Sequence, residues 1–217
     1  MNKPIFSGAA VLLLMLAGTA SLMAADTPVL PYVEYTIATE GPFSLLCNPD
    51  GSGRPMTEAF NSVGQPVDGT ITMILYDATP PWGNPVPLFP KEDIWLTDIT
   101  GSLALCPAGS IPDENTDING MTSWTGALYV GGHVEPGEGN QLAIMVNGWI
   151  PDGAYLPDFR INSADLNGDL VVNLTDVAHF SMGYFGPYEY KRDLHWDEVV
   201  NLSDIAELAR AFGARCP

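Results

Sequence analysis

The chain is poor in basic residues, histidine and cysteine, and the first two shortages each exclude a class of function. Lys and Arg together number 8 of 217 residues, against 26 Asp and Glu, so the formal net charge is −18. Nucleic-acid binding depends on Lys and Arg at phosphates, and we exclude it. Three His residues, with no Gly-x-Ser-x-Gly, His-Glu-x-x-His or phosphate-loop motif, leave no catalytic constellation, so we expect no enzyme.

Long apolar runs are also missing, apart from one near the N-terminus. Met1-Asn-Lys3 precedes an apolar run from Ala9 to Ala20, and small residues follow up to Ala25. This order is typical of a secretory signal peptide cleaved after Ala25, and the run is shorter than the roughly 20 residues of a membrane span. We therefore predict a secreted or cell-surface protein without a membrane span. Loss of Lys3 gives the mature chain a formal charge of −19.

The three cysteines are Cys47, Cys106 and Cys216, and all follow the signal sequence. An exported chain meets an oxidising compartment, where disulfides form. Sequence alone does not choose among the pairings. We favour Cys47–Cys106 because both residues lie beside predicted strands of one region. Cys216 would then be a thiol on a frayed tail or a link to another chain.

Most of the mature chain reads as all-β, with alternating apolar residues between turns rich in Gly, Pro, Asn and Asp. The predicted strands cover residues 32–37, 43–47, 70–76, 94–96, 103–106, 121–130 and 141–147. Their number and the length of the region suit an immunoglobulin-like β-sandwich. We therefore predict a mainly β protein with a signal peptide at 1–25, this sandwich at 26–158 and a small α-helical domain at 159–217. A short linker is expected near 151–158.

Three segments of this region also resemble bacterial immunoglobulin-like repeats of the invasin and intimin kind. They are Ile71-Thr-Met-Ile-Leu-Tyr-Asp77, Gly83-Asn-Pro-Val-Pro87 and Thr116-Asp-Ile-Asn-Gly-Met-Thr122. The resemblance covers about residues 67–147. It implies a spacer or adhesion role, although a fold alone does not fix a function.

The C-terminal part contains one acidic pattern twice. The first copy is Asp165-Leu-Asn167-Gly-Asp169-Leu-Val171-Val-Asn173-Leu-Thr-Asp176, and each position recurs 28 residues later, from Asp193 to Asp204. Calcium takes about six to eight oxygens, which a 12-residue loop supplies at positions 1, 3, 5, 7, 9 and 12, with a backbone carbonyl at position 7. We therefore predict two calcium ions. Their ligands would be Asp165, Asn167, Asp169, Val171, Asn173 and Asp176 in the first loop, and Asp193, His195, Asp197, Val199, Asn201 and Asp204 in the second.

Two features depart from this pattern. Position 6, usually Gly, is Leu170 in the first loop and Glu198 in the second, and a non-Gly residue at positive φ costs about 1 kcal/mol. His195 at position 3 offers nitrogen to a cation that prefers oxygen, so the second loop is expected to bind more weakly or to take a water there. The alternative is a pair of acidic turns that place Asp176 and Asp204 at positive helix ends.

Each loop precedes an apolar pattern of helical period, but no convincing helix precedes either loop. Pro157 stands before the first loop and Gly186-Pro187 before the second, and proline disfavours an entering helix. A duplicated loop with Asp at position 12 and a helix only after it resembles a bacterial type I dockerin. The resemblance covers residues 161–217.

This resemblance implies an extracellular protein partner, such as a cohesin. In dockerins the partner meets loop positions 10 and 11 and the helix after each loop. Those positions are Leu174 and Thr175 in the first copy, and Leu202 and Ser203 in the second. Two alternatives stay open: the two Leu side chains pack inside the domain or on the sandwich, or the whole domain is a calcium-stiffened tail on its own sandwich.

Together these patterns predict a secreted, non-catalytic bacterial protein in which a calcium-ordered dockerin-like domain mediates attachment or assembly of the immunoglobulin-like domain. The alternative is a carbohydrate-binding protein that uses the sandwich as its sugar receptor. Trp82, in a loop rich in Pro and Gly, is the one Trp expected to be exposed for stacking. Trp95, Trp124 and Trp149 lie in or beside strands, where Trp usually fills the core.

Overall fold

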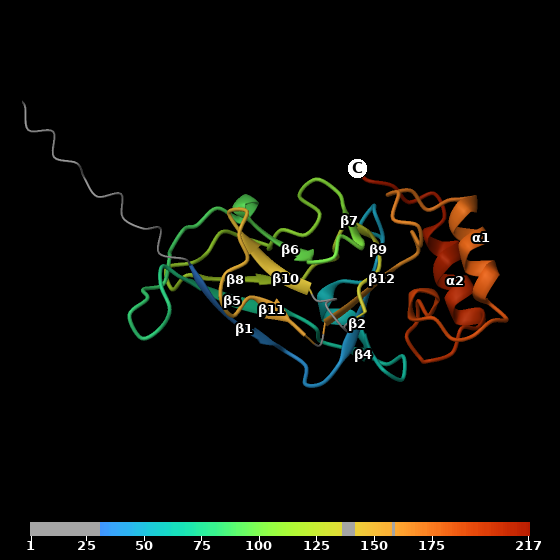
Figure 1. Cartoon of the computed structure of the whole chain (residues 1–217), viewed down its shortest axis with the longest axis horizontal. Coiled ribbons are helices and arrows are strands. Elements are labelled where there is room, and N and C mark those ends of the chain that lie inside the picture. The colour runs from blue at the N-terminus through green and yellow to red at the C-terminus, as the bar shows by residue number, and fades with distance from the viewer. Residues whose placement is uncertain (1–30, 136–141, 158) are drawn as a thin grey trace, which may run out of the picture.

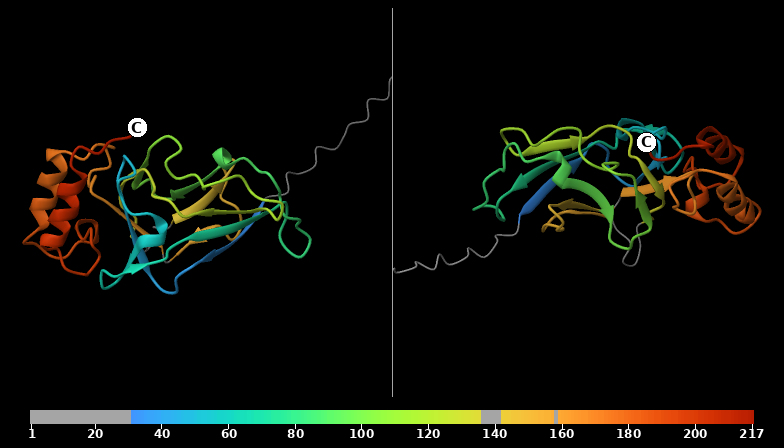
Figure 2. Two further views of the ribbon diagram at one scale, coloured as in Figure 1. Left: turned by 180° about the vertical axis from the view of Figure 1, so that it is seen from behind. Right: turned by 90° about the horizontal axis from the view of Figure 1, so that it is seen from above.

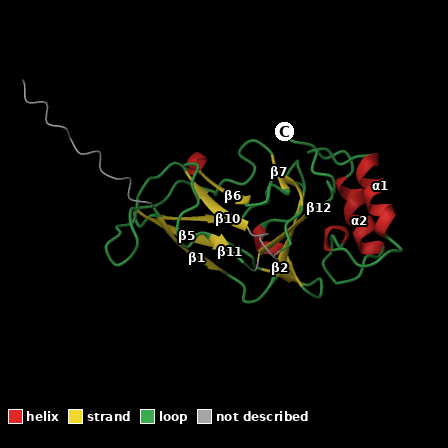
Figure 3. Cartoon of the chain, in the orientation of Figure 1, coloured by secondary structure: helices red, strands yellow, loops and turns green. Residues whose placement is uncertain are grey.

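The computed structural model describes residues 31–135, 142–157 and 159–217, so the predicted signal peptide lies outside it. The described chain is mainly β, with two α-helices at the C-terminal end (Figure 1, Figure 3). The helices are α1 (Leu174–Gly183) and α2 (Leu202–Ala211). The strands are β1 (Tyr32–Ile37), β2 (Phe43–Cys47), β3 (Ala59–Asn61), β4 (Pro66–Val67), β5 (Ile71–Tyr76), β6 (Ile94–Asp98), β7 (Leu103–Leu105), β8 (Met121–Trp124), β9 (Val130–Gly132), β10 (Leu142–Val146), β11 (Tyr155–Leu156) and β12 (Phe159–Ser163).

The strands form four small sheets, which we call the β region (described residues 31–163). The strand orders are β1-β5-β8, β11-β10-β6, β12-β2-β3-β4 and β7-β9. All pairs are antiparallel except β12 with β2. Alternation explains the burial of β5, where Ile71, Met73 and Leu75 face the core. The mainly β prediction is confirmed, while an immunoglobulin-like sandwich stays a prediction.

The predicted strands are present, with one exception at residues 121–130. The prediction of a single strand there is wrong, because β8 ends at Trp124 and β9 begins at Val130. The carboxylate of Asp113 accepts the backbone N–H and the hydroxyl of Thr125, at 2.9 and 2.8 Å. These bonds take Thr125 out of the strand ladder. Trp124 and Val130 are nevertheless both buried in the core.

The predicted linker and the start of the predicted helical domain each carry a strand of the β region. β11 extends the sheet beside β10, and β12 runs parallel to β2, with Phe159 opposite Phe43 and Ser163 opposite Cys47. β2 therefore lies inside its sheet, between β12 and β3, and all its residues are buried. The sheet thus crosses the predicted boundary at residue 158.

The predicted Cys47–Cys106 disulfide is wrong. Cys106 is bonded to Cys216, with Cα atoms 5.6 Å apart, and Cys47 is a free thiol. Cys47 is fully buried within β2, and the partner of Cys106 comes from the C-terminal tail. The C-terminal tail does not fray, because Arg215 forms an antiparallel bridge with Val171. That bridge brings Cys216 back to the β region.

The helical region (residues 164–217) lies at one end of the molecule, and its C-terminal tail returns toward the β region (Figure 2). Phe180, Leu194 and Leu208 belong to the same buried apolar cluster as the strands. The described residues include no helix with the length and apolar character that crossing a membrane requires.

Candidate metal centre

The two acidic loops adopt one backbone shape. Positions 4 and 6 have positive φ in both copies, at 71° and 65° for Gly168 and Leu170 and at 47° and 65° for Trp196 and Glu198. The non-Gly residues at position 6 therefore occupy the left-handed conformation that the sharp turn requires, at a cost of about 1 kcal/mol each. The second copy repeats the first although four of its twelve residues differ in type.

The carboxylate at position 1 organises the turn of each loop. Asp165 accepts the backbone N–H groups of positions 5 and 6, at 3.2 and 2.7 Å. Asp193 makes the same two bonds, at 3.1 and 2.8 Å. Each aspartate thus lies beneath the turn formed by the residues that follow it.

The carboxylate at position 12 ties the two ends of each loop together. Asp176 accepts the N–H groups of positions 3 and 9, at 3.3 and 2.8 Å, and Asp204 does the same at 2.9 and 2.7 Å. The bond to position 9 belongs to a capping box with Asn173 or Asn201 as N-cap. Helix capping therefore explains that bond. It does not require the second bond, which reaches position 3 across the loop.

The side chains at positions 3, 5 and 9 are held within the same loops. The Asn173 amide donates to the carbonyl of Val171 and the Asn201 amide to that of Val199, both at 3.1 Å. These contacts bring the predicted ligands at positions 9 and 7 together in both copies. Asp169 accepts the amide of Asn167 at 3.0 Å, which joins positions 3 and 5 of the first loop.

The aspartates at positions 1 and 12 are buried as carboxylates without basic partners. Asp165, Asp176, Asp193 and Asp204 are each 0% exposed. No ion pair in the described part of the chain reaches any of them. A buried carboxylate must take up a proton, pair with a counter-charge or bind a metal ion. The donor set therefore fits a divalent cation that prefers oxygen ligands.

This burial changes the acidity of the loops. Burial raises the pKa of Asp165, and the charges of Asp176 and Asp169 raise it further. In the second loop, burial raises the pKa of Asp193 to about 6; the Tyr188 hydroxyl bond opposes this rise and the charge of Asp204 adds to it. Burial likewise raises the pKa of Asp204. While no cation is bound, the carboxylates of each loop therefore disfavour one another's negative charge.

Across the described ranges, no group of three or more His, Cys, Asp or Glu side chains could hold a metal ion as it stands. Each predicted site also relies on Asn oxygens and a backbone carbonyl, which such a group does not include. Convergence of the twelve predicted ligands on two ions therefore stays a prediction.

Position 3 is where the two loops differ most. The His195 ring lies 4.7 Å from the Phe60 ring, measured between centroids. A Cβ added to Gly64 would lie 2.9 Å from the imidazole, so the 61–65 turn also packs closely on it. His195 thus contacts the β region, and this placement favours the predicted water at position 3.

Loop positions 10 and 11 begin the helices and face outward. Leu174 is 73% exposed and Leu202 is 74% exposed, so the alternative that they pack inside the domain or on the β region is wrong. Thr175 and Ser203 are exposed as well. Val177 and Ile205, three residues farther along, also form a matched pair at 38% each. We call the exposed apolar surface of α1 and α2 the helical face, and it includes Leu174, Val177, Leu202 and Ile205. A groove in it is lined by Val177, Ile205, Leu208, Ala209 and Phe212.

A different side of the helical region is fixed to the β region. The hydroxyls of Ser44 and Tyr190 are hydrogen-bonded at 2.8 Å, and the Asn162 amide donates to the carbonyls of Tyr190 and Asp193, at 2.8 and 2.9 Å. Arg54 lies 3.8 Å from Glu207 of α2. Packing on the protein's own β region therefore leaves the helical face free.

The tryptophans agree with expectation in part. Trp82 is 83% exposed, as predicted, and Trp124 is buried in the core. The expectation of a core position is wrong for Trp149, which is 68% exposed because it follows the tight Asn147-Gly148 turn at the end of β10.

No protein-family model, curated protein or solved structure matches the chain. The resemblances to dockerins and to immunoglobulin-like repeats therefore depend on the motifs alone.

Proposed function

We propose that this is a secreted, non-catalytic attachment protein whose two calcium-ordered loops present the helical face to an extracellular protein partner. The observation that carries the proposal is the duplicated loop. In both copies the carboxylate at position 1 accepts the same two backbone N–H groups and is buried without a basic partner. Each copy then begins a helix with an exposed Leu.

Calcium would be held by the carboxylates at positions 1, 5 and 12, the Asn oxygens and the carbonyl at position 7. When bound, it supplies the positive charge that the buried aspartates lack. Asp165 and Asp193 each have one carboxylate oxygen that accepts a single N–H, and that oxygen keeps a lone pair for a cation. The loop hydrogen bonds of Asp165 and Asp193 are therefore compatible with ligation, and they hold the backbone in a shape suited to it.

The helical face supports a protein partner because its apolar residues come in matched pairs. Leu174 and Leu202 have nearly equal exposure, as do Val177 and Ile205. Soluble proteins rarely expose contiguous apolar patches without a use for them. The internal duplication offers a partner such as a cohesin two related surfaces on one domain.

We further propose that the β region is an immunoglobulin-like spacer. The three segments that resemble invasin-type repeats contact one another: Asn84 donates its N–H to the Asp77 carboxylate, and the Thr116 hydroxyl donates to the carbonyl of Val86 at 2.7 Å. The N–H of Leu75 donates to the carbonyl of Gly120 at 2.9 Å. These contacts support the resemblance in space as well as in sequence.

Calcium titration calorimetry on residues 26–217 tests the metal proposal. We expect two binding events, of which Asp165→Ala removes one and Asp193→Ala the other. Asp152→Ala, an exposed carboxylate of the β region, serves as the matched control and should keep both. Absence of any calcium uptake by the wild-type chain would reject the proposal.

A double substitution, Leu174→Asp with Leu202→Asp, tests the partner surface. Leu88→Asp is the matched control, since Leu88 is 74% exposed in the β region. Secreted and surface proteins of the source cells would be passed over each immobilised chain with calcium or with chelator. A partner should bind the wild type and the control only in calcium, and equal retention by the double variant would contradict the proposed surface.

A second candidate function is carbohydrate binding by the β region, favoured by the exposed rings of Trp82 and Trp149. Retention of the protein on polysaccharide should then fall for Trp82→Ala and should be the same with calcium and with chelator. Retention unaffected by this substitution would argue against Trp82 as a stacking ring.

A further inference from the structure

The β region encloses the first loop on one side. The carbonyl of Asp165 accepts the N–H of Gly132 in β9 at 2.8 Å, and the Ser163 hydroxyl donates to the carbonyl of Val130 at 3.3 Å. A Cβ added to Gly131 would overlap the Asp165 carboxylate. Strand β9 therefore lies directly against the carboxylate at position 1.

The C-terminal tail contacts the same loop at positions 7 and 8. Val172 donates its N–H to the carbonyl of Ala214 at 2.8 Å, and Gly213 donates to the carbonyl of Val172 at 2.9 Å. Arg215 forms its bridge with Val171, whose carbonyl is the predicted ligand at position 7. The tail thus supports the backbone of the first loop at the point where it would meet the ion.

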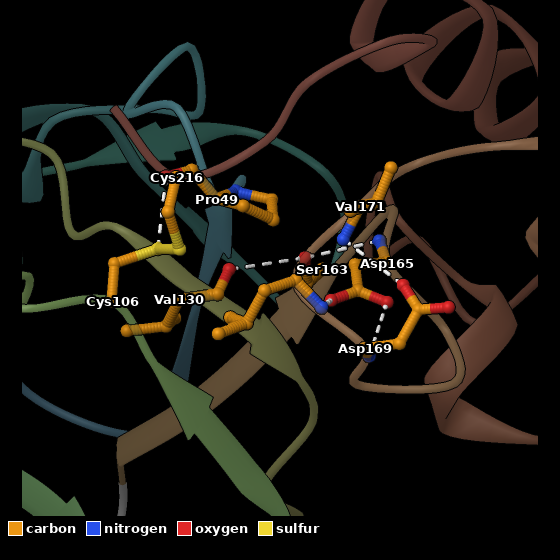
Figure 4. Close-up of a disulfide and its surroundings, with 9 residues drawn as sticks. Pro49, Cys106, Val130, Ser163, Asp165, Asp169, Val171 and Cys216 are labelled. Carbon is orange, nitrogen blue, oxygen red and sulfur yellow. Dashed lines mark hydrogen bonds between the residues drawn. A yellow bond between two sulfur atoms is a disulfide. The ribbon is translucent and has the colours of Figure 1, made fainter.

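The Cys106–Cys216 disulfide joins this tail to the β region. Cys106 directly follows β7, the strand paired with β9. Figure 4 shows the disulfide close to the first loop, with Val130 and Ser163 between the sulfur atoms and Asp165. The contacts therefore form a closed ring that passes through the first loop. In the described chain no such bridge reaches Val199, the position-7 residue of the second loop.

We propose that calcium binding at the first loop and the Cys106–Cys216 disulfide are thermodynamically linked. The proposal rests on the calcium function proposed above. With the bond intact, the tail stays on Val171 and the loop is preorganised for the ion; without it, the tail is free to leave. Linkage of this kind is reciprocal, so calcium also resists reduction of the bond by the same factor.

Reduction by a small thiol proceeds through a mixed disulfide. Two thiol molecules supply two electrons and two protons, the S–S bond of Cys106 and Cys216 breaks to two thiols, and the reductant leaves as its own disulfide. Cys47 stays outside this exchange, because burial raises the pKa of its thiol and the attacking species is a thiolate.

The test isolates one loop at a time in the full chain from residue 26. Calcium is titrated into Asp193→Ala, which keeps only the first loop, before and after reduction with dithiothreitol and alkylation. We expect the affinity to fall about 5-fold or more on reduction. Asp165→Ala, which keeps only the second loop, is the matched control and should change less than twofold.

Equal affinity of the oxidised and reduced first loop would overturn the linkage while leaving the calcium function intact. Absence of calcium binding in both backgrounds would overturn both proposals, so the two failures are distinguishable. A further measurement avoids alkylation. In glutathione buffers, saturating calcium should make the disulfide of Asp193→Ala harder to reduce. The equilibrium constant for reduction should change by the same factor as the calcium affinity of the first loop does between the oxidised and reduced chains. A reduction midpoint that is the same with and without calcium would also overturn the linkage.

Gly131→Ala tests the β9 side of the ring with the disulfide intact. The added methyl group displaces the Asp165 carboxylate, so calcium affinity at the first loop should fall about 10-fold, as for other groups that orient a ligand. Gly126→Ala is the matched control, because the nearest atom to its added Cβ lies 3.8 Å away. Unchanged affinity in Gly131→Ala would contradict a positioning role for β9.

Discussion

The two acidic loops share a backbone shape but not a set of neighbours. The first loop has Asn167 at position 3 bonded within the loop and is contacted by β9 and the C-terminal tail. The second places His195 on Phe60 and receives a hydrogen bond from the Tyr188 hydroxyl on Asp193, at 2.9 Å. The difference teaches that the loop sequence sets the backbone, while the neighbouring elements decide how each copy serves binding or packing.

This comparison predicts that calcium stabilises the chain mainly through the first loop. An ion present at about 1,000 times its Kd adds about 4 kcal/mol per site to the free energy of unfolding. The increase in Tm with calcium should therefore be larger for Asp193→Ala than for Asp165→Ala at the same calcium concentration. Thermal unfolding with calcium and with chelator measures this, and equal increases would remove the asymmetry between the loops.

The ends of the two helices offer a second contrast, since Gly183 of α1 corresponds to Ala211 of α2. A Cβ added to Gly183 would overlap the guanidinium of Arg192, which donates to the carbonyl of His179 at 3.0 Å. Gly183→Ala should therefore destabilise the fold by about 1–3 kcal/mol, although Ala is the better helix former. Urea unfolding measures the loss, and a gain in stability would show that Arg192 moves aside freely.

Replacing His195 by the Asn found in the first loop should separate calcium ligation by the second loop from its packing on the β region. His195→Asn restores an oxygen at position 3 and removes the contact with Phe60. Calcium affinity of the second loop should rise about 10-fold, as expected for a better ligand set. The calcium-free chain should lose about 1 kcal/mol of stability, the worth of an aromatic pair. If His195→Asn binds calcium no better than the wild type, the side chain at position 3 is not a calcium ligand in the second loop.

The raised pKa of Asp193, about 6, predicts a pH dependence of stability. Between its ordinary pKa near 4 and this value, the folded chain holds a proton that the unfolded chain has released. Without calcium, stability should therefore fall as pH rises through this interval. Urea unfolding in chelator at pH 4.5 and 6.5 should show a smaller fall for Asp193→Asn than for wild type or Asp152→Asn. Equal falls in all three would exclude Asp193 as the source.

Calcium should reverse this pH dependence, because the ion requires the charged carboxylate. Calorimetry near pH 6 in buffers of different ionisation enthalpy should then detect proton release on binding. Release should be smaller in Asp193→Asn than in the wild type.

The sequence alone predicted much of the fold, because strands and helix starts depend on neighbours along the chain. Alternation in residues 71–76 identified β5, and a helix is associated with each loop as predicted, although α1 and α2 begin at loop position 10 and not after the loop. The left-handed conformation at Leu170 and Glu198 follows from loop position as well. Such features are local, so a short stretch of residues carries enough information to specify them.

Only the tertiary structure decided which distant residues meet. The Cys106–Cys216 bond spans 110 residues, and the parallel pairing of β12 with β2 and the contact of His195 with Phe60 join equally remote segments. No local pattern contains these partners, because they depend on how the sheets pack and where the tail returns. The sequence therefore determined two loops of one kind, and three-dimensional packing made them unequal.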